Sequence, residues 1–129
     1  MSKIHNPDSI PAPVSSYSHG IAVPPGARWI YISGQIALDQ EGGIPDDFEQ
    51  QCQIVWTNLY AVLDSAGMSR HDLVKLTVYM TDPEDLPVFR TVRDKFLEDT
   101  RPATTLLFVS QLARKEWRLE IEGVAAKSD

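Results

Sequence analysis

The chain has 129 residues, 43% hydrophobic and 23% charged, which is enough apolar material for the core of a single domain. A formal net charge of −6 and scattered basic residues disfavour binding to nucleic-acid phosphates. The single cysteine, Cys52, excludes an internal disulfide and a cysteine-based zinc cluster, and no stretch approaches the ~20 apolar residues that span a bilayer. The first residues, MSKIHNPDSIPAP, lack the apolar run of a signal peptide, so we expect a cytoplasmic protein with no membrane partner.

The first half of the chain predicts an arm, a hairpin and a helix. Three prolines within residues 1–16 predict an irregular N-terminal arm to a single domain of residues 1–129. Two β-rich runs, Ser18–Val23 and Trp29–Leu38, are separated by a glycine-containing loop and predict a hairpin. Apolar residues at helical spacing then predict a helix from Asp46 to Ala66.

This first helix has start and stop signals in the sequence. Asp46 followed three residues later by Glu49 resembles a capping box, and Gly67 suits the end of the helix. The apolar stripe consists of Phe48, Cys52, Val55, Trp56, Leu59, Val62 and Leu63. Because Cys52 lies on this stripe, we expect it to behave as a small buried hydrophobe.

The second half of the chain predicts a strand, a helix and two further strands. Leu73–Met80 alternates between apolar and polar residues, as a strand does. Asp82 or Asp85 is suited to open a second helix. Thr104–Leu112 and Arg118–Ala126 complete the set as strands. The predicted order is β-β-α-β-α-β-β, an α+β fold with one mixed sheet.

The predicted order leaves one face of the sheet without helices. Right-handed crossovers between parallel strands place both helices on the same face. The strand alternation puts a mixture of aromatic and polar residues on the other face. They are Trp29, Tyr31, Lys75, Thr77, Tyr79, Glu120 and Glu122. Such a surface is too aromatic for water and too polar for the core of a monomer, so we expect a homo-oligomer with polar groups lining the gaps between subunits.

No residue pattern by itself identifies a catalytic centre. His5, His19 and His71 stand in unlike contexts without the spacing of metal ligands, so we expect no metal and no cofactor. The stretch GMSRHD lacks the nucleophile elbow that serine catalysis requires. The neighbouring carboxylates of Glu120 and Glu122 face the same side of a strand, which leaves solvent, a partner chain and a binding site all open.

Several segments follow one another in the order found in a known family. They are YSHGI, YISGQIALD, NLYAVLDSAGMS, LVKLTVYMTD, RPATTLLFV and LEIEGVAA. Over nearly its whole length the chain resembles the Rid family, the reactive intermediate deaminases also known as YjgF or UK114 proteins. The resemblance implies a chorismate-mutase-like protomer that forms a homotrimer, with the sheets packed inward and a ligand cleft at each subunit interface.

The resemblance also implies an activity. The best-studied branch of the family hydrolyses enamine and imine intermediates, such as 2-aminoacrylate, to 2-keto acids and ammonia. The family's cleft tyrosine matches Tyr17, and the strand end whose backbone approaches the ligand matches Ser33 and Gly34. Glu120 matches the glutamate whose carboxylate holds and polarises the attacking water.

One motif departs from the deaminating branch. There the sequence reads P-A-R, and the arginine holds the substrate carboxylate through a bidentate pair of hydrogen bonds. Here Thr104 takes the place of that arginine, a change that costs roughly 1.5–3 kcal/mol of binding. Arg93 stands where the branch often has an asparagine in the cleft. Its guanidinium either binds the ligand from a different position than the family's arginine, or is solvated on the helix surface. Leu106 stands in place of the family's cysteine.

Three functions therefore remain as hypotheses. The leading one is a small-molecule cleft between subunits that hydrolyses an imine or enamine other than the usual 2-imino acids, with Glu120 as the catalytic residue and Tyr17, Ser33, Gly34, Arg93 and Thr104 binding the substrate. The alternative is a non-catalytic trimer that binds a metabolite. An endoribonuclease is third, since the acidic charge disfavours an RNA partner.

Overall fold

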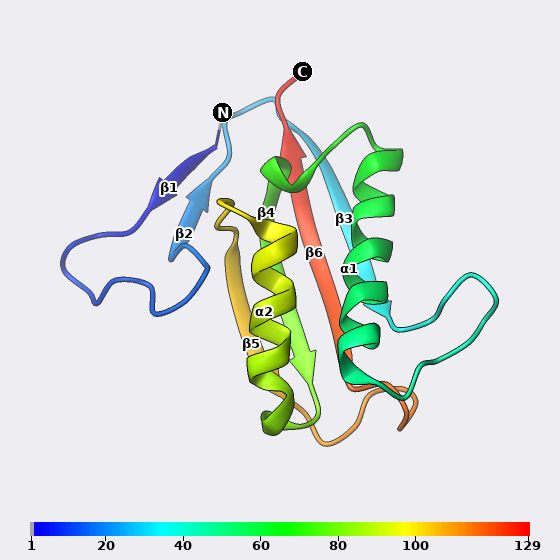
Figure 1. Cartoon of the computed structure of the whole chain (residues 1–129). Coiled ribbons are helices and arrows are strands. Elements are labelled where there is room, and N and C mark those ends of the chain that lie inside the picture. Colours follow the sequence, from blue (N-terminus) through cyan, green and yellow to red (C-terminus); the bar gives the residue numbers. More distant parts are fainter. Residues whose placement is uncertain (1) are drawn as a thin grey trace.

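In the computed structural model, which describes residues 2–129, the helices pack on one face of a mixed β-sheet (Figure 1). The strands of this sheet are β3 (Arg28–Ile36), β4 (Leu73–Met80), β5 (Ala103–Phe108) and β6 (Leu119–Lys127), and the helices are α1 (Phe48–Ser65) and α2 (Leu86–Leu97). Their order across the sheet is β3-β6-β4-β5, with β4 parallel to β5 and β6 antiparallel to β3 and β4. The predicted α+β fold is confirmed.

The N-terminal segment differs from the prediction. Lys3–His5 form β1, which pairs antiparallel with β2 (Gly20–Ala22) in a small separate ribbon at the side of the main sheet (Figure 1). The arm is therefore not wholly irregular, and the predicted hairpin between Ser18–Val23 and Trp29–Leu38 is wrong, since β3 pairs with β6 instead. The physical reason lies in the linker that joins them. Pro24 and Pro25 lack the N–H groups of a strand ladder, so the chain leaves one sheet there and enters the other.

The residue that caps helix α1 lies one position later than the sequence suggested. The side chain of Asp47, not Asp46, caps the helix by accepting a hydrogen bond from the Gln50 backbone N–H at 3.0 Å. The helix ends where Gly67 takes a positive φ of 68°, a conformation that glycine adopts without strain.

Both predicted starts of the second helix are used. Asp82 caps a 3₁₀ turn over Pro83–Asp85, accepting a hydrogen bond from the Glu84 backbone N–H at 3.0 Å, and Asp85 then precedes α2. The next strand, β5, is shorter than predicted and ends at Phe108. Among residues 2–129, no helix combines the length and the hydropathy needed to cross a membrane.

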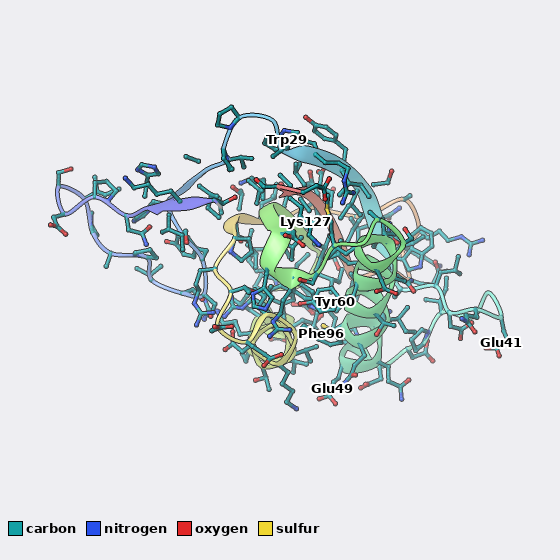
Figure 2. All side chains as sticks on the ribbon, turned by 90° about the horizontal axis from the view of Figure 1, so that it is seen from above. Trp29, Glu41, Glu49, Tyr60, Phe96 and Lys127 are labelled. Atoms are coloured by element: carbon teal, nitrogen blue, oxygen red, sulfur yellow. The ribbon has the colours of Figure 1, made fainter. Side chains whose placement is uncertain are left out.

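The core lies between the sheet and the helices and contains an aromatic cluster. The Trp56 ring stacks on the Phe96 ring with centroids 5.8 Å apart and on the Phe89 ring at 6.4 Å. Figure 2 shows Tyr60 and Phe96 close together on the helix side and Trp29 on the opposite side of the sheet. Cys52 is fully buried, and burial raises the pKa of its thiol to about 12, so it acts as the expected small hydrophobe.

The helix-free face carries the residues that the alternation predicted. In β6, Leu119 and Ile121 are fully buried against the helices, whereas Glu122 is exposed on the other face. On β3, the Trp29 side chain is 46% exposed and the Tyr31 side chain is 78% exposed. We call this surface of β3, β6, β4 and β5 the open face.

Candidate functional site

The Glu120 carboxylate lies directly against the backbone of Gly34. A methyl group built on Gly34 would stand 1.8 Å from Glu120 Oε2 and 2.7 Å from Cδ, so only a glycine leaves room for this side chain. The contact forms where the register of β3 and β6 shifts between Ile32 and Gln35. Two residues that lie far apart in the chain, and that the sequence assigned to one site, are thus neighbours.

A shallow hollow opens beside this contact on the open face. Its volume is ≈ 420 Å³. It is lined by Gly34, Tyr79, Gln111, Leu112, Glu120 and Glu122, with Val109 and Ala113. This volume lies in the range of pockets that bind small molecules.

Tyr79 and Glu122 also line this hollow, although the sequence gave Tyr79 no role in the site and left a site role for Glu122 as one of three possibilities. The Tyr79 hydroxyl donates a hydrogen bond to Glu122 Oε1, and this bond raises the pKa of the phenol. The available signal was the period-2 alternation, which placed both side chains on the same face as Glu120.

The Glu120 carboxyl has a perturbed acidity. Partial burial raises its pKa above the ordinary value, and the nearby negative charge of Glu122 raises it further. Perturbed carboxyls in hollows are common at functional sites because a proton is then exchanged nearer to neutral pH. Ser33, the residue before Gly34, is exposed on β3, and its carbonyl oxygen accepts a hydrogen bond from Gln35 Nε2 at 3.1 Å.

The other predicted ligand contacts lie on the opposite face of the sheet. Thr104 pairs in parallel register with Leu76, which is buried against the helices, so Thr104 faces the helix side at the β5 edge. Its hydroxyl donates to the Pro102 carbonyl oxygen at 2.9 Å. Ser18 forms a parallel bridge with Ala103, which brings the end of the arm to the start of β5.

Tyr17 lies in this anchored part of the arm. It is half-buried, and its hydroxyl oxygen accepts a hydrogen bond from the Val14 backbone N–H at 3.3 Å. The adjacent Ser18 hydroxyl donates to the Arg101 carbonyl oxygen at 2.5 Å. Tyr17 and Thr104 are therefore held at the same edge of the molecule, one by the arm and one by β5.

Arg93 is not a solvated helix residue, since only 9% of it is exposed. Its Nε donates to Asp94 Oδ1 at 3.0 Å, its Nη2 donates to Ser16 Oγ at 3.3 Å, and its guanidinium lies over the Phe89 ring at 5.9 Å. Partial burial would raise the pKa of Asp94, but hydrogen bonds from Ser16 and Arg93 outweigh it and lower the pKa. Arg93 thus already has a carboxylate partner and fastens the arm to α2.

The predicted site residues therefore fall into two groups within one chain, which we call half-sites. The first half-site is Glu120, Gly34 and Ser33 on the open face. The second is at the β5 edge and consists of Thr104 and Arg93 on the helix side, with Tyr17 in the arm beside them. The strand order places β3 and β5 at opposite edges of the sheet, so the two half-sites do not meet within one chain.

Comparison with known proteins identifies the family. Residues 8–127 match the family model described as Endoribonuclease L-PSP, to which the YjgF and RutC proteins belong. The chain is a member of the Rid family. A RutC family protein of Pyrococcus abyssi is 34% identical to this Rid chain over 93% of both proteins. TdcF of Escherichia coli K12, whose name places it among the reactive intermediate deaminases, is 31% identical over 99% of both.

Solved structures of Rid proteins share the fold. YyfB of Yersinia pestis, a Rid protein of unknown function, superposes with a TM-score of 0.88 at 30% identity, over 98% of each chain. TdcF of E. coli with bound serine superposes with a TM-score of 0.75 at 32% identity, over 98% of this chain and 99% of its own. The predicted Rid resemblance and the chorismate-mutase-like architecture are thus confirmed.

The residues of this Rid chain that could bind a metal are dispersed. Within residues 2–129, no group of three or more histidine, cysteine, aspartate or glutamate side chains lies close enough to share an ion. The imidazole of His19, for example, forms its hydrogen bond with the Pro11 carbonyl oxygen at 2.7 Å, in the arm.

Proposed function

We propose that this Rid protein forms a homotrimer in which the β5 edge of one copy lies against the open face of the next. Thr104 and Tyr17 of one copy would then meet Glu120 and Gly34 of another, which completes the site. The division of the half-sites between opposite faces of the sheet supports this assembly. The exposure of Trp29 and Tyr31 supports it as well, because large exposed aromatic side chains on one face are typical of interfaces.

The reaction we propose is hydrolysis of a C=N bond. The imine takes up a proton at nitrogen, water adds to the carbon while the Glu120 carboxylate accepts the proton of that water, and the carbinolamine then releases ammonia or an amine to leave a carbonyl compound. Protonation makes the imine carbon a better electrophile, and a carboxylate stabilises the iminium charge. The observation that carries the proposal is the Glu120 carboxyl, partly desolvated against Gly34 at the edge of a small hollow.

The substrate is an imine other than the usual 2-imino acids. The Thr104 hydroxyl already donates to the Pro102 carbonyl oxygen, and it offers no positive charge. Arg93, the displaced guanidinium that the sequence suggested, is engaged by Asp94 and Ser16. Neither position therefore offers the free bidentate donor that a substrate carboxylate prefers.

Trapping experiments test this proposal. Imines are generated in situ, 2-imino acids by an amino-acid oxidase and carboxylate-free imines by an amine oxidase, and semicarbazone formation is followed with and without the protein. We expect the protein to accelerate loss of carboxylate-free imines before they are trapped, and light scattering to report three chains per particle. Strong acceleration on 2-aminoacrylate or 2-iminobutyrate would contradict the altered substrate, and a monomeric mass would contradict the assembly.

Replacing Thr104 by arginine is expected to move the preference toward 2-imino acids. A charge-assisted pair with the substrate carboxylate is worth roughly 1.5–3 kcal/mol, so kcat/KM for 2-iminobutyrate should rise about 10- to 100-fold. The same assay on a carboxylate-free imine should show no gain. Thr57→Arg, an exposed position on α1, is the matched control and should leave both rates unchanged. Equal gains from both variants would show that added positive charge alone is responsible.

A non-catalytic metabolite-binding trimer is the second candidate, favoured by the serine bound to TdcF. It predicts ligand-induced stabilisation without turnover, and binding that survives Glu120→Gln. In a thermal-shift screen, ligand at ~100 times its dissociation constant adds about 2.7 kcal/mol of stability, which is readily detected.

Ribonuclease activity, suggested by the description of the family model, is the third candidate because the net charge of −6 disfavours binding to RNA. RNA cleavage that survives repurification and is lost in Glu120→Gln would favour it.

A further inference from the structure

The open face carries a second carboxylate whose place relative to Glu120 is fixed by the sheet. Glu120 and Glu122 are two residues apart on β6, so their Cα atoms stand about 7 Å apart on the same face. In the register of β4 and β6, Tyr79 lies opposite Glu120 and Thr77 lies opposite Glu122. The Tyr79 side chain crosses diagonally, and its hydroxyl donates to Glu122 rather than to Glu120.

This hydrogen bond makes the two carboxyls unlike. Glu122 Oε1 accepts a hydrogen bond from the Tyr79 hydroxyl, which holds that carboxyl in place. The Glu120 carboxylate accepts no hydrogen bond from the described residues 2–129 and is partly buried against Gly34, both of which disfavour its ionised form. Burial, and after it the nearby charge of Glu122, therefore raise the pKa of Glu120.

Among the described residues, the basic side chains of the neighbouring strand segments are engaged with other partners. Facing the hollow, β3 contributes Gly34 and the segment after β5 contributes Gln111 and Leu112, none of which titrates. On β4, the Lys75 ammonium donates to Thr105 Oγ1 at 2.7 Å, toward β5 and away from β6. At the start of β6, Arg118 pairs with Asp85 at 3.3 Å.

We propose that Tyr79 and Glu122 are a positioning pair for Glu120: Tyr79 holds the Glu122 carboxyl in place beside the hollow, and the negative charge of Glu122 there favours Glu120 as the carboxyl that carries a proton to the ligand. The inference rests on the proposed function and assigns to Glu120 the protonation of the imine nitrogen as well as the removal of a proton from water. Glu120 transfers its proton to the imine nitrogen, and the resulting carboxylate accepts a proton from water as the new C–O bond forms. The carbinolamine then breaks its C–N bond as Glu120 gives its proton to the nitrogen and takes the hydroxyl proton, which releases ammonia and leaves the carbonyl. The net reaction is imine plus water to carbonyl plus ammonia, and Glu120 ends protonated as it began.

Titration of Glu120 by NMR tests the pair without any need for turnover. The protein is labelled with ¹³C at the glutamate side-chain carboxyl, and the Glu120 signal is assigned from its absence in Glu120→Gln. Because Glu122→Gln removes the neighbouring negative charge, we expect the Glu120 midpoint to move to lower pH. Tyr79→Phe removes the hydrogen bond that holds the Glu122 carboxyl in place, so it should also lower the Glu120 midpoint, by a smaller amount. Glu41→Gln, in an exposed loop, should leave it unchanged.

The outcomes separate this inference from the proposed function. A Glu120 midpoint that is the same in the wild type and in Glu122→Gln would overturn the positioning pair, whatever the activity. A Glu120 midpoint that falls in Glu122→Gln but not in Tyr79→Phe would contradict the positioning role of Tyr79. If imine hydrolysis is observed, the alkaline limb of its kcat profile should move to lower pH with the Glu120 midpoint, and a limb that stays in place would overturn proton delivery by Glu120. Absence of hydrolysis with the expected titration would contradict the proposed function alone.

Discussion

Replacing Gly34 by alanine is expected to abolish most imine hydrolysis while leaving the fold intact. The added methyl group would stand 1.8 Å from Glu120 Oε2, and the carboxylate, as the far end of a flexible side chain, is the group that moves. Losing a correctly placed general acid–base group lowers kcat/KM by roughly 10²- to 10⁴-fold. The measurement is kcat/KM in the trapping assay, with circular dichroism and chemical denaturation as checks of the fold.

The control variants test whether the loss of activity in Gly34→Ala arises from displacement of the Glu120 carboxylate. Glu120→Gln should lose activity to the same extent, and the double variant Gly34→Ala/Glu120→Gln should lose no more than either single variant, because both remove one carboxylate from one place. Gly20→Ala is the matched glycine control, since its methyl group would meet nothing nearer than His5 Cβ at 3.8 Å. Losses that multiply in the double variant would show that Gly34 acts independently of Glu120.

Trp56→Ala is expected to destabilise the protein by about 3–5 kcal/mol, the largest stability effect that we predict. Trp56 is fully buried and stacks on Phe89 and Phe96 between α1, α2 and the sheet, so its removal leaves a cavity that the aromatic cluster cannot refill. Urea denaturation measures the change in the free energy of unfolding.

Trp56→Phe should cost less than about 1.5 kcal/mol, because it keeps a stacked ring in the same place. The indole Nε1 is buried without a hydrogen-bond partner among the described residues, so removing it sacrifices no hydrogen bond. A cost for Trp56→Phe as large as that for Trp56→Ala would contradict this and indicate that a buried water satisfies the indole N–H.

Features that depend on local periodicity were predictable from the sequence. The apolar stripe of α1, the alternation in β4 and β6, and the glycine that ends the first helix each follow from residues a few positions apart. The boundary at Asp47 was missed by one residue because two consecutive aspartates are both good caps. The predicted hairpin was wrong for another reason. Pro24 and Pro25 interrupt the ladder between the two β-rich runs, and β1, from the arm, pairs with β2 instead.

By itself, the sequence determined the class of fold, the family, and which face of its strand Glu120 occupies, because period-2 and period-3.6 patterns fix the face of a residue locally. Only the tertiary structure decided what each side chain meets. The contact of Glu120 with Gly34, the bond from Tyr79 to Glu122 and the burial of Arg93 beside the arm all join residues distant in the chain. The separation of Thr104 from Glu120 on opposite faces follows likewise from strand order and register, which depend on the packing of the whole chain and not on any short segment of it.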